Sequence, residues 1–219
     1  PGNGLWELPL DAPTGTDLRE WLQLDDHIIE VDLTPNRGDC LSISGLSCEL
    51  AALTGQKQTF LNSPTIPATH AEQLPVTIQS PADCASYAGR LIRNIDPSRT
   101  TPLWLSEKLR RAGIKSIHPV VDVVNYVMLE LGQPMHAFDF DTLSGGIDVR
   151  FAQPEETLVL LDGQTVALTA NTLIIADHQQ ALAIAGIMGG AATAVSATTQ
   201  HIFLESAWFN PVSMAGKAR

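Results

Sequence analysis

The sequence lacks any uninterrupted apolar run of the roughly 18 residues that a membrane-spanning helix requires. Its first residues, PGNGLWELPLD, contain neither the basic stretch nor the apolar stretch of a secretion signal. We therefore expect no insertion into a membrane and a cytoplasmic location. With 219 residues, of which 44% are hydrophobic, the chain is long enough to bury a core and should fold as a globular protein.

Cysteine and positive charge are also scarce. The three cysteines, Cys40, Cys48 and Cys84, are odd in number and never have the spacing of a zinc-chelating pair. We expect reduced, packed thiols, as is usual in a cytosol. The 13 basic residues are outnumbered by 24 acidic ones, which gives a net charge of −11. Because this charge would repel phosphate over most of the surface, a nucleic-acid partner would have to be held by something other than bulk charge.

The first part of the chain predicts one strand and one helix. The β-branched alternation of IIEVDL favours a short strand over residues 28–33, followed by a turn. A helix is expected to begin after Asp39, as its N-cap, and to end at Gly55. Cys40 and Cys48 would lie about two turns apart on that helix and pack in the core. Its apolar spacing comes from Leu46, Leu50 and Leu53.

The later part predicts two helices and then mostly strands. In TTPLWLSEKLRRAG, Thr101 is the expected N-cap, Pro102 the first helical residue and Gly113 the residue past the end. In PVVDVVNYVMLELG the helix should close at Gly132, and Asp162-Gly163 indicates a type I′ hairpin. The apolar face of the second helix is Val120, Val124, Val127 and Leu131. The predicted strands are PVTIQS, CASYAGRLIRNI, IDVRFA, TLVLLDGQTVAL, TLIIAD, ALAIAG and HIFLESAWF.

These elements predict an α+β fold. It would comprise a small N-terminal part with a helix and a strand, followed by a mixed domain that becomes strand-rich toward its C-terminus. Prolines without periodicity indicate an exposed connection in the middle of the chain. We therefore expect a first part over residues 1–60, a linker over 61–75 and a second domain over 76–219.

Few signatures of catalysis are present. Metal ligands could come only from a set without the usual spacings, so no metal is expected; the set is His118, His136, Asp139, Asp141 and Glu205. There is no G-x-S-x-G elbow, and nothing around the thiols would activate them. The glycine-rich stretch GIMGGAATA, residues 186–194, lacks the ending of a phosphate-binding loop. It is either a tight connection between strands or a backbone surface that a ligand approaches closely.

Two side chains stand out. His136, in GQPMHAFDFD, is either a site residue or a turn histidine that donates to a backbone carbonyl or to Asp139. Glu205 lies in HIFLESAWF, where alternation places it on one face with Phe203 and Ala207. A carboxylate in these surroundings is costly to bury unless it has a partner, which a polar ligand or a buried Lys or Arg could supply.

Five segments, in this order, resemble the bacterial phenylalanyl-tRNA synthetase beta subunit from about Gly4 to Arg219; they are LTPNRGDCLSISGLSCELAALTG, SIHPVVDVVNYVMLELGQPMHAFDFD, LVLLDGQ, IADHQQALAIAGIMGG and IFLESAWFNPVSMAGKAR. The resemblance implies a fragment that contains part of the first domain and most of the B3/B4 editing domain, truncated before its motif is complete. That domain hydrolyses tyrosine wrongly attached to tRNA(Phe). It also implies an alpha2beta2 heterotetramer with alpha subunits that use ATP and magnesium, and no cofactor in this fragment.

The resemblance also implies roles for particular residues. His136 would position the ester and a water, Glu205 would accept a hydrogen bond from the tyrosine hydroxyl, and any side chain at Gly189 would intrude on the ligand. Asp139 and Asp141 would form and cap a turn. Further implied contacts to the substrate are Asn125, Pro134 and Val124, and Lys115 would contact the tRNA.

Two residues depart from the family's pattern. Val124 replaces a frequent threonine and removes a hydroxyl from the pocket wall. Lys115 replaces a frequent arginine and gives a point charge in place of a bidentate contact. Two rival hypotheses stay open: a non-catalytic module that docks the alpha subunit or tRNA, and a free-standing metal hydrolase. The presence of both His136 and Glu205 favours editing over a relic pocket.

Overall fold

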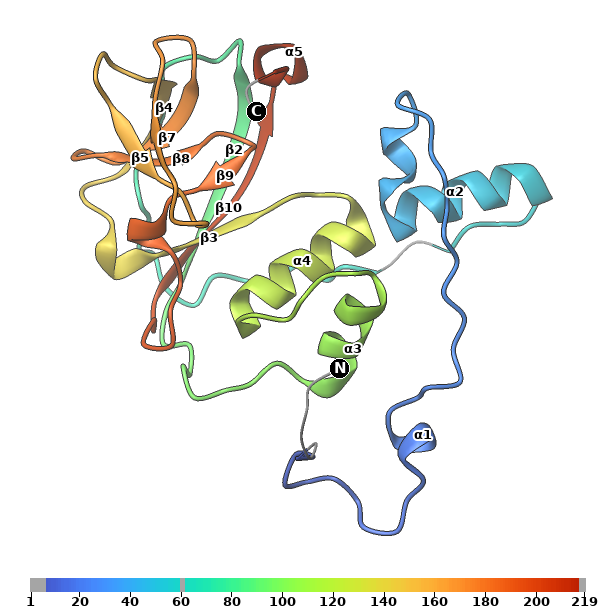
Figure 1. Cartoon of the computed structure of the whole chain (residues 1–219). Coiled ribbons are helices and arrows are strands. Elements are labelled where there is room, and N and C mark those ends of the chain that lie inside the picture. Colours follow the sequence, from blue (N-terminus) through green and yellow to red (C-terminus); the bar gives the residue numbers. More distant parts are fainter. Residues whose placement is uncertain (1–6, 60–61, 217–219) are drawn as a thin grey trace.

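The computed structural model describes residues 7–59 and 62–216 (Figure 1). Its α-helices are α1 (Leu18–Trp21), α2 (Ile43–Thr54), α3 (Leu103–Arg111), α4 (Pro119–Leu131) and α5 (Pro211–Met214), and its 3-10 helices are η1 (Gly38–Leu41), η2 (Phe140–Thr142) and η3 (Ala191–Thr193). Its strands are β1 (Val76–Ile78), β2 (Cys84–Ile92), β3 (His136–Asp139), β4 (Ile147–Phe151), β5 (Thr157–Val159), β6 (Thr165–Ala167), β7 (Leu173–Ala176), β8 (Ala181–Ile184), β9 (Met188–Gly189) and β10 (Ile202–Phe209).

The strands form three sheets. The largest has the order β1-β4-β7-β8-β9, the second has the order β2-β10-β3, and β5 pairs with β6. Strands β1 and β4 are parallel, whereas the other paired strands are antiparallel. Helices and mainly antiparallel sheets in separate parts of the chain confirm the predicted α+β class, and most of the predicted strands form.

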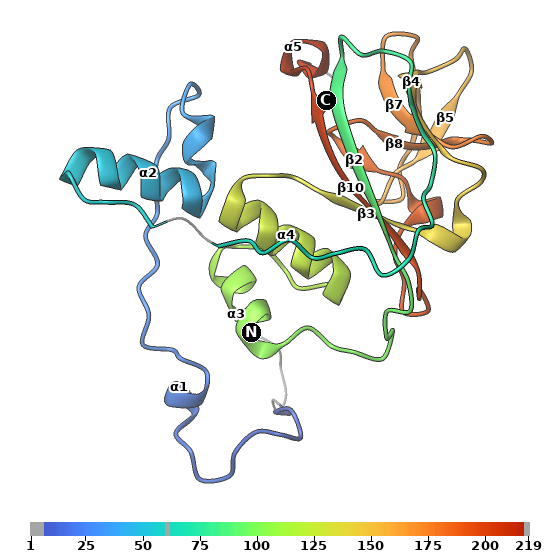
Figure 2. The same ribbon diagram turned by 180° about the vertical axis from the view of Figure 1, so that it is seen from behind.

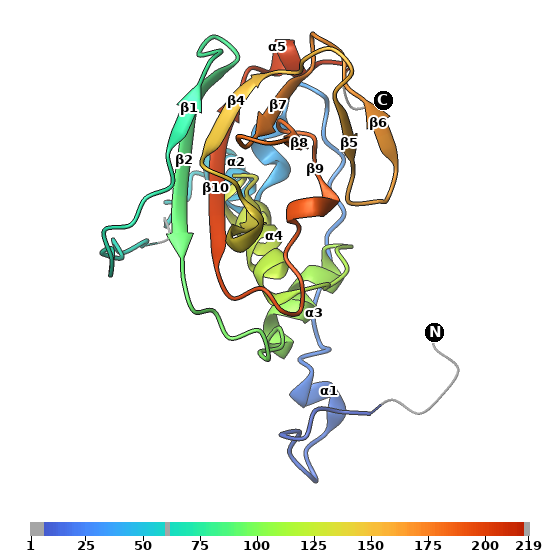
Figure 3. The ribbon, with the colours of Figure 1, turned by 90° about the vertical axis from the view of Figure 1, so that its left-hand side faces the viewer.

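The main core lies between the two larger sheets, which Figure 3 shows next to each other. Phe138 of β3 and Phe203 of β10 are fully buried against apolar side chains of the five-stranded sheet. Because side chains alternate along a strand, the face of β10 that carries Phe203 also carries Glu205. The core face of the three-stranded sheet therefore positions the candidate site.

Helix α4 forms as its sequence predicts. The side chain of His118 caps its N-terminus by accepting from the Val120 N–H at 3.3 Å, and Pro119 begins the helix. Gly132 ends it with a φ of 80°, a conformation that glycine adopts without strain. The chain then leads directly into β3, so the end of α4 fixes where His136 begins its strand.

Asp122 connects the two central helices and was not predicted to be buried. Its carboxylate accepts hydrogen bonds from the Thr101 hydroxyl, from Ser116 Oγ at 2.5 Å and from the Ile117 N–H at 3.0 Å. The prediction that Thr101 is the N-cap of α3 is therefore wrong. The N-cap is Pro102, which makes no side-chain hydrogen bond. The Thr101 hydroxyl is used instead to bind Asp122.

The predicted strand at residues 28–33 is wrong, because these residues pair with no strand in the described part of the chain. Ile28 and Ile29 are 69% and 81% exposed, so the segment lacks the neighbour that a strand requires. Figure 2 shows the N-terminal part, including α2, set apart from the sheets. On α2, Leu50 and Leu53 are exposed, so the predicted apolar spacing is not buried in this structure.

The predicted start of α2 is also wrong. Its N-cap is Ser42, whose hydroxyl accepts from the Gly45 N–H at 3.1 Å. The Asp39 carboxylate instead accepts hydrogen bonds from Nε and Nη2 of the Arg37 side chain, at 3.1 Å and 2.9 Å, so its oxygens do not cap the helix. The predicted end at Gly55 is confirmed, with a φ of 67°.

Two smaller predictions also fail. All three cysteines are free, but Cys48 is exposed, whereas Cys40 and Cys84 are buried as predicted. At the β5–β6 hairpin only Gly163 has positive φ, whereas a type I′ turn requires it at Asp162 as well.

No helix in the described ranges has the length and apolar character that crossing a bilayer requires.

Candidate functional site

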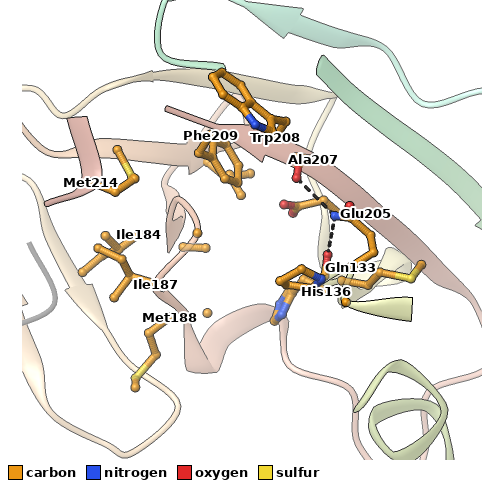
Figure 4. Close-up of a pocket in the computed structure, with 17 residues that line it drawn as sticks. Gln133, His136, Ile184, Ile187, Met188, Glu205, Ala207, Trp208, Phe209 and Met214 are labelled. Atoms are coloured by element: carbon orange, nitrogen blue, oxygen red, sulfur yellow. Dashed lines mark hydrogen bonds between the residues drawn. The ribbon is translucent and has the colours of Figure 1, made fainter. Parts of the chain in front are cut away.

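A cavity of about 460 Å³ lies beside the C-terminal half of β10 (Figure 4). Its walls come from the segment between α4 and β3, from the connection between β8 and β9, and from α5. Most lining side chains are apolar, and His136 and Glu205 are the titratable ones. The lining residues labelled in Figure 4 are Gln133, His136, Ile184, Ile187, Met188, Glu205, Ala207, Trp208, Phe209 and Met214.

His136 and Glu205 lie directly opposite each other on antiparallel strands β3 and β10. Opposite residues in such a pair project to the same face of the sheet. Figure 4 shows both side chains bordering the cavity, with the Glu205 carboxylate directed into it. The sheet register therefore brings together two side chains that are far apart in the sequence.

Glu205 is 5% exposed and takes part in none of the salt bridges of the described residues. Its Oε2 accepts a hydrogen bond from the Tyr87 hydroxyl at 3.1 Å. Burial raises the pKa of Glu205 to about 7, and the Tyr87 hydrogen bond opposes this rise. Of the two partners considered from the sequence, a polar ligand or a buried Lys or Arg, the basic side chain is absent from the described residues, and Tyr87 supplies a hydrogen bond.

The interpretation of His136 as a turn residue bonded to Asp139 or to a carbonyl is wrong. His136 begins a strand, and its Nε2 is buried without a hydrogen-bond partner among the described residues. The Asp139 carboxylate accepts instead from the Thr199 hydroxyl at 2.6 Å and from the Asp141 N–H at 3.1 Å, so Asp139 caps η2. Burial lowers the pKa of His136 to about 4, which keeps its imidazole neutral at pH 7.

Gly189 gives the imidazole its space. A Cβ at this position would lie 2.5 Å from His136 Cε1 and 3.0 Å from Nε2, closer than packed atoms approach. A Cβ at Gly190 would lie 2.5 Å from the Leu182 carbonyl oxygen. Both glycines therefore have a packing reason in this tight connection, and the approach of a ligand to Gly189 stays a prediction.

Of the remaining predicted site residues, only Pro134 lines the cavity. Pro134 lines the same cavity as His136, Gly189 and Glu205. Val124 lines a separate apolar groove of about 410 Å³ between α4 and the three-stranded sheet, and Met135 borders both spaces. Asn125 and Lys115 are not among the residues that line the cavity, and Lys115 is exposed between α3 and α4.

Sequence reasoning missed Tyr87. The alternation of Tyr87, Gly89 and Leu91 along β2 was a signal that could have placed Tyr87 on the inner face. These three residues oppose Ala207, Glu205 and Phe203 of β10, in that order. The aromatic and sulfur-containing part of the wall was also missed; it consists of Met135, Met188, Trp208, Phe209 and Met214.

The residues considered as metal ligands do not converge. His118 caps α4, Asp139 caps η2, and Glu205 is bound by Tyr87. Within residues 7–59 and 62–216 no group of three or more His, Cys, Asp or Glu side chains could hold a metal ion.

The fold and the cavity can now be set beside known proteins. The chain belongs to the B3/4 domain family, whose model matches residues 83–219 and so includes every residue that lines the cavity. Phenylalanine–tRNA ligase beta subunits are similar to almost the whole chain. Identity is 57% to that of Pseudomonas fluorescens, 58% to that of Pseudomonas syringae pv. syringae and 54% to that of Pectobacterium atrosepticum, each over 99% of this chain. The resemblance drawn from the five segments is confirmed.

The chain spans 27% of the length of each of these relatives. Among solved structures, an N-terminal fragment of the phenylalanyl-tRNA synthetase beta subunit from Pyrococcus horikoshii is similar at a TM-score of 0.47 and 15% identity. That similarity covers 81% of this chain and 54% of the other chain.

Proposed function

We propose that the chain is the proofreading part of a phenylalanine–tRNA ligase beta subunit and hydrolyses Tyr-tRNA(Phe). The observation that carries this proposal is Glu205, a buried carboxylate that pairs with no basic side chain of the described residues and is directed into a cavity with apolar walls. Burying a carboxylate without a charged partner costs stability, and an apolar residue at this position would stabilise the fold more. A role in binding a ligand would explain why the carboxylate is present. A ligand with an apolar ring and one hydroxyl matches this arrangement.

Tyrosine and phenylalanine differ only in that hydroxyl. Bound tyrosine would donate to Glu205, whereas bound phenylalanine would leave the carboxylate without its ligand partner inside an apolar wall. Sites that read a hydroxyl in this way discriminate by roughly 10⁴ to 10⁵. The cavity volume of about 460 Å³ lies within the range of small-molecule sites, roughly 300 to 1,000 Å³, and suits one aromatic side chain.

The reaction needs no protein nucleophile. A water would attack the ester carbonyl carbon, the bond to the ribose oxygen would break, and the ribose hydroxyl would regain a proton. An aminoacyl ester is already activated, so orientation of the water and the carbonyl supplies most of the acceleration. His136 suits this role because its imidazole is neutral and lies beside Glu205, where it would position the ester and water.

The proposed partners are those that the resemblance to the beta subunit implies. The chain would act within an alpha2beta2 heterotetramer on tRNA(Phe), with ATP and magnesium used by the alpha subunits and no cofactor at this cavity. Lys115, exposed between α3 and α4, is proposed as a contact to the tRNA, where a single positive charge would act against the acidic background of −11. Residues 1–60 would form a separate part joined by the linker at 61–75.

Asn125 and Val124 do not line the cavity in this structure, and we propose that they act on the substrate through neighbouring residues. Val124 lines the groove behind Met135, and Asn125 lies next to it on α4. A direct contact would require α4 to move toward the cavity when tRNA binds. Their substitution should therefore affect clearance less than substitution of Glu205.

The test is hydrolysis of purified Tyr-tRNA(Phe) by the assembled ligase that carries this sequence, with Phe-tRNA(Phe) as the matched substrate. Clearance of Tyr-tRNA(Phe) well above its spontaneous hydrolysis, with slow loss of Phe-tRNA(Phe), supports editing. Spontaneous rates for both substrates would instead support a non-catalytic module that docks the alpha subunit or tRNA.

A further inference from the structure

Tyr87 and Glu205 are 118 positions apart in the sequence, and their side chains meet behind the cavity wall. The Tyr87 hydroxyl donates to Glu205 Oε2 at 3.1 Å, and this is the only hydrogen bond to the carboxyl group from the described residues. We propose that Tyr87 is a positioning residue that holds Oε2 so that Oε1 alone faces the cavity as the acceptor for a ligand hydroxyl. This inference rests on the proposed editing function and extends it to how specificity is built.

The register of the sheet makes the contact possible. Glu205 lies opposite Gly89 on β2, and Tyr87 lies opposite Ala207, one pair further along the same face. Diagonal neighbours on one face are within reach of an aromatic side chain. Gly89 has no side chain of its own to block this path, and a Cβ there would lie 2.2 Å from the Phe203 ring. Phe203 thus covers Gly89, and Tyr87 reaches the carboxylate from the diagonal.

The Tyr87 ring is itself held in place. It is packed against the main core cluster, beside the fully buried Cys84. A tyrosine side chain has only two rotatable bonds before its ring is fixed, so a packed ring holds its hydroxyl in one position. The donor that Glu205 meets is therefore preorganised, and the carboxyl group cannot rotate freely between its two oxygens.

The other groups around Glu205 do not supply this hydrogen bond. On β3 the neighbour is His136, which makes no hydrogen bond to Glu205 in the described structure, and on β2 the nearby thiol of Cys84 donates to the Ser86 carbonyl oxygen at 3.6 Å. Burial and the charge of Glu205 raise the pKa of Tyr87, so its hydroxyl keeps its proton and remains a donor. Tyr87 is thus the one side chain of the described residues that favours the ionised form of Glu205 by a hydrogen bond.

The test uses Tyr87→Phe in the assembled ligase, with clearance of Tyr-tRNA(Phe) and Phe-tRNA(Phe) measured from about pH 5.5 to 8.5. Phenylalanine keeps the packed ring and removes only the hydroxyl. We expect the preference for Tyr-tRNA(Phe) at pH 7 to fall by about tenfold and the midpoint of its pH dependence to rise by about one unit, because a charged group loses one hydrogen bond. Phenylalanine charging should not change.

The matched control is Tyr126→Phe, since Tyr126 is the other tyrosine of the chain and lies on α4 against Trp104. It should leave preference and midpoint as in the wild type. In a Glu205→Gln background, Tyr87→Phe should have little further effect on preference, which keeps the test decisive if the single variant is less stable.

Two failures are distinguishable. If the wild-type ligase does not clear Tyr-tRNA(Phe), the proposed function fails. If the wild type clears it and Tyr87→Phe keeps the wild-type preference and midpoint, or slows both substrates equally without moving either quantity, the positioning role of Tyr87 is overturned.

Discussion

His136 at the start of β3 faces Glu205 across the β3–β10 pair, so the sheet register sets a neutral imidazole beside a buried carboxyl group. Burial shifts the two pKa values in opposite directions, to about 4 for His136 and to about 7 for Glu205. The group that changes its charge near neutral pH is therefore the glutamate. This reverses the usual expectation for a histidine and a glutamate with unperturbed values.

The pH dependence of editing should follow Glu205 rather than His136. Clearance of Tyr-tRNA(Phe) should rise with pH through about 7, as Glu205 ionises and gains acceptor strength. His136→Ala should lower the rate by less than the roughly 100-fold typical of losing a general base, and should keep the rise. Glu205→Gln should abolish the rise. Measurement of both variants between about pH 5.5 and 8.5 decides; a rise that disappears only in His136→Ala would make His136 the base.

Glu205 should also make stability depend on pH. Because its pKa is raised from 4.5 to about 7, the folded chain binds the proton more tightly than the unfolded chain. The stability cost of the charge is absent below about pH 4.5, grows between the two values and is complete above about pH 7. Glu205→Gln, whose amide oxygen can still accept from Tyr87, should therefore be more stable than the wild type by about 2 kcal/mol at pH 8 and by much less at pH 4.5.

Urea unfolding of the 219-residue chain at the two pH values measures this difference. Glu30→Gln is the control, because Glu30 is exposed in the N-terminal part. A gain in stability from Glu205→Gln that is the same at both pH values would contradict the assignment of a raised pKa to this carboxyl group.

Gly189 and His136 should be energetically coupled. Gly189→Ala places a methyl group within 2.5 Å of His136 Cε1, and should lower the free energy of unfolding by about 1 to 3 kcal/mol. In a His136→Ala background the same change should cost less, with a coupling energy above about 0.5 kcal/mol. Gly38→Ala is the control, since a Cβ at Gly38 meets nothing within 4 Å. Additive losses would show that Gly189 has another structural reason.

Asp122 should be a main support of the α3–α4 pair. Burial raises its pKa, but hydrogen bonds from Ser116, Thr101 and the Ile117 N–H outweigh this and leave the pKa below its usual value. Asp122→Ala should lower the free energy of unfolding by about 3 kcal/mol at pH 7, because these donors lose their acceptor. The loss should shrink as pH falls below 3.8, because Asp122 of the unfolded wild-type chain is then protonated before Asp122 of the folded chain, whose pKa is lower. Asp141→Ala, at an exposed position, should change stability little; equal losses would refute the assignment.

Elements with local start and stop signals could be predicted from the sequence. Helix α4 follows its prediction because Pro119 begins it, Gly132 ends it and both act within one turn. The start of α2 could not be predicted in this way, because Arg37 pairs with Glu49, twelve positions away, as well as with Asp39. The strand at 28–33 failed for a different reason: alternation indicates a strand only where another strand is available to pair with it.

The candidate site shows the same division. Glu205 was identifiable because an acidic residue in an apolar strand is unusual, and its burial confirms that part of the argument. Tyr87 was missed because its contact with Glu205 depends on the register of β2 against β10. The reason for Gly189 depends likewise on where the His136 ring lies. Sequence patterns indicate which residue is out of place, whereas register decides what it contacts.

The most direct test of the account compares Glu205→Ala with the wild type in the assembled ligase, using Tyr-tRNA(Phe) and Phe-tRNA(Phe) as parallel substrates at pH 7.5. If Glu205 reads the tyrosine hydroxyl, clearance of Tyr-tRNA(Phe) should fall by at least about tenfold, the loss expected for a hydrogen bond to a charged group. Clearance of Phe-tRNA(Phe) and charging with phenylalanine should change little. Undiminished clearance of Tyr-tRNA(Phe) by Glu205→Ala would contradict the account.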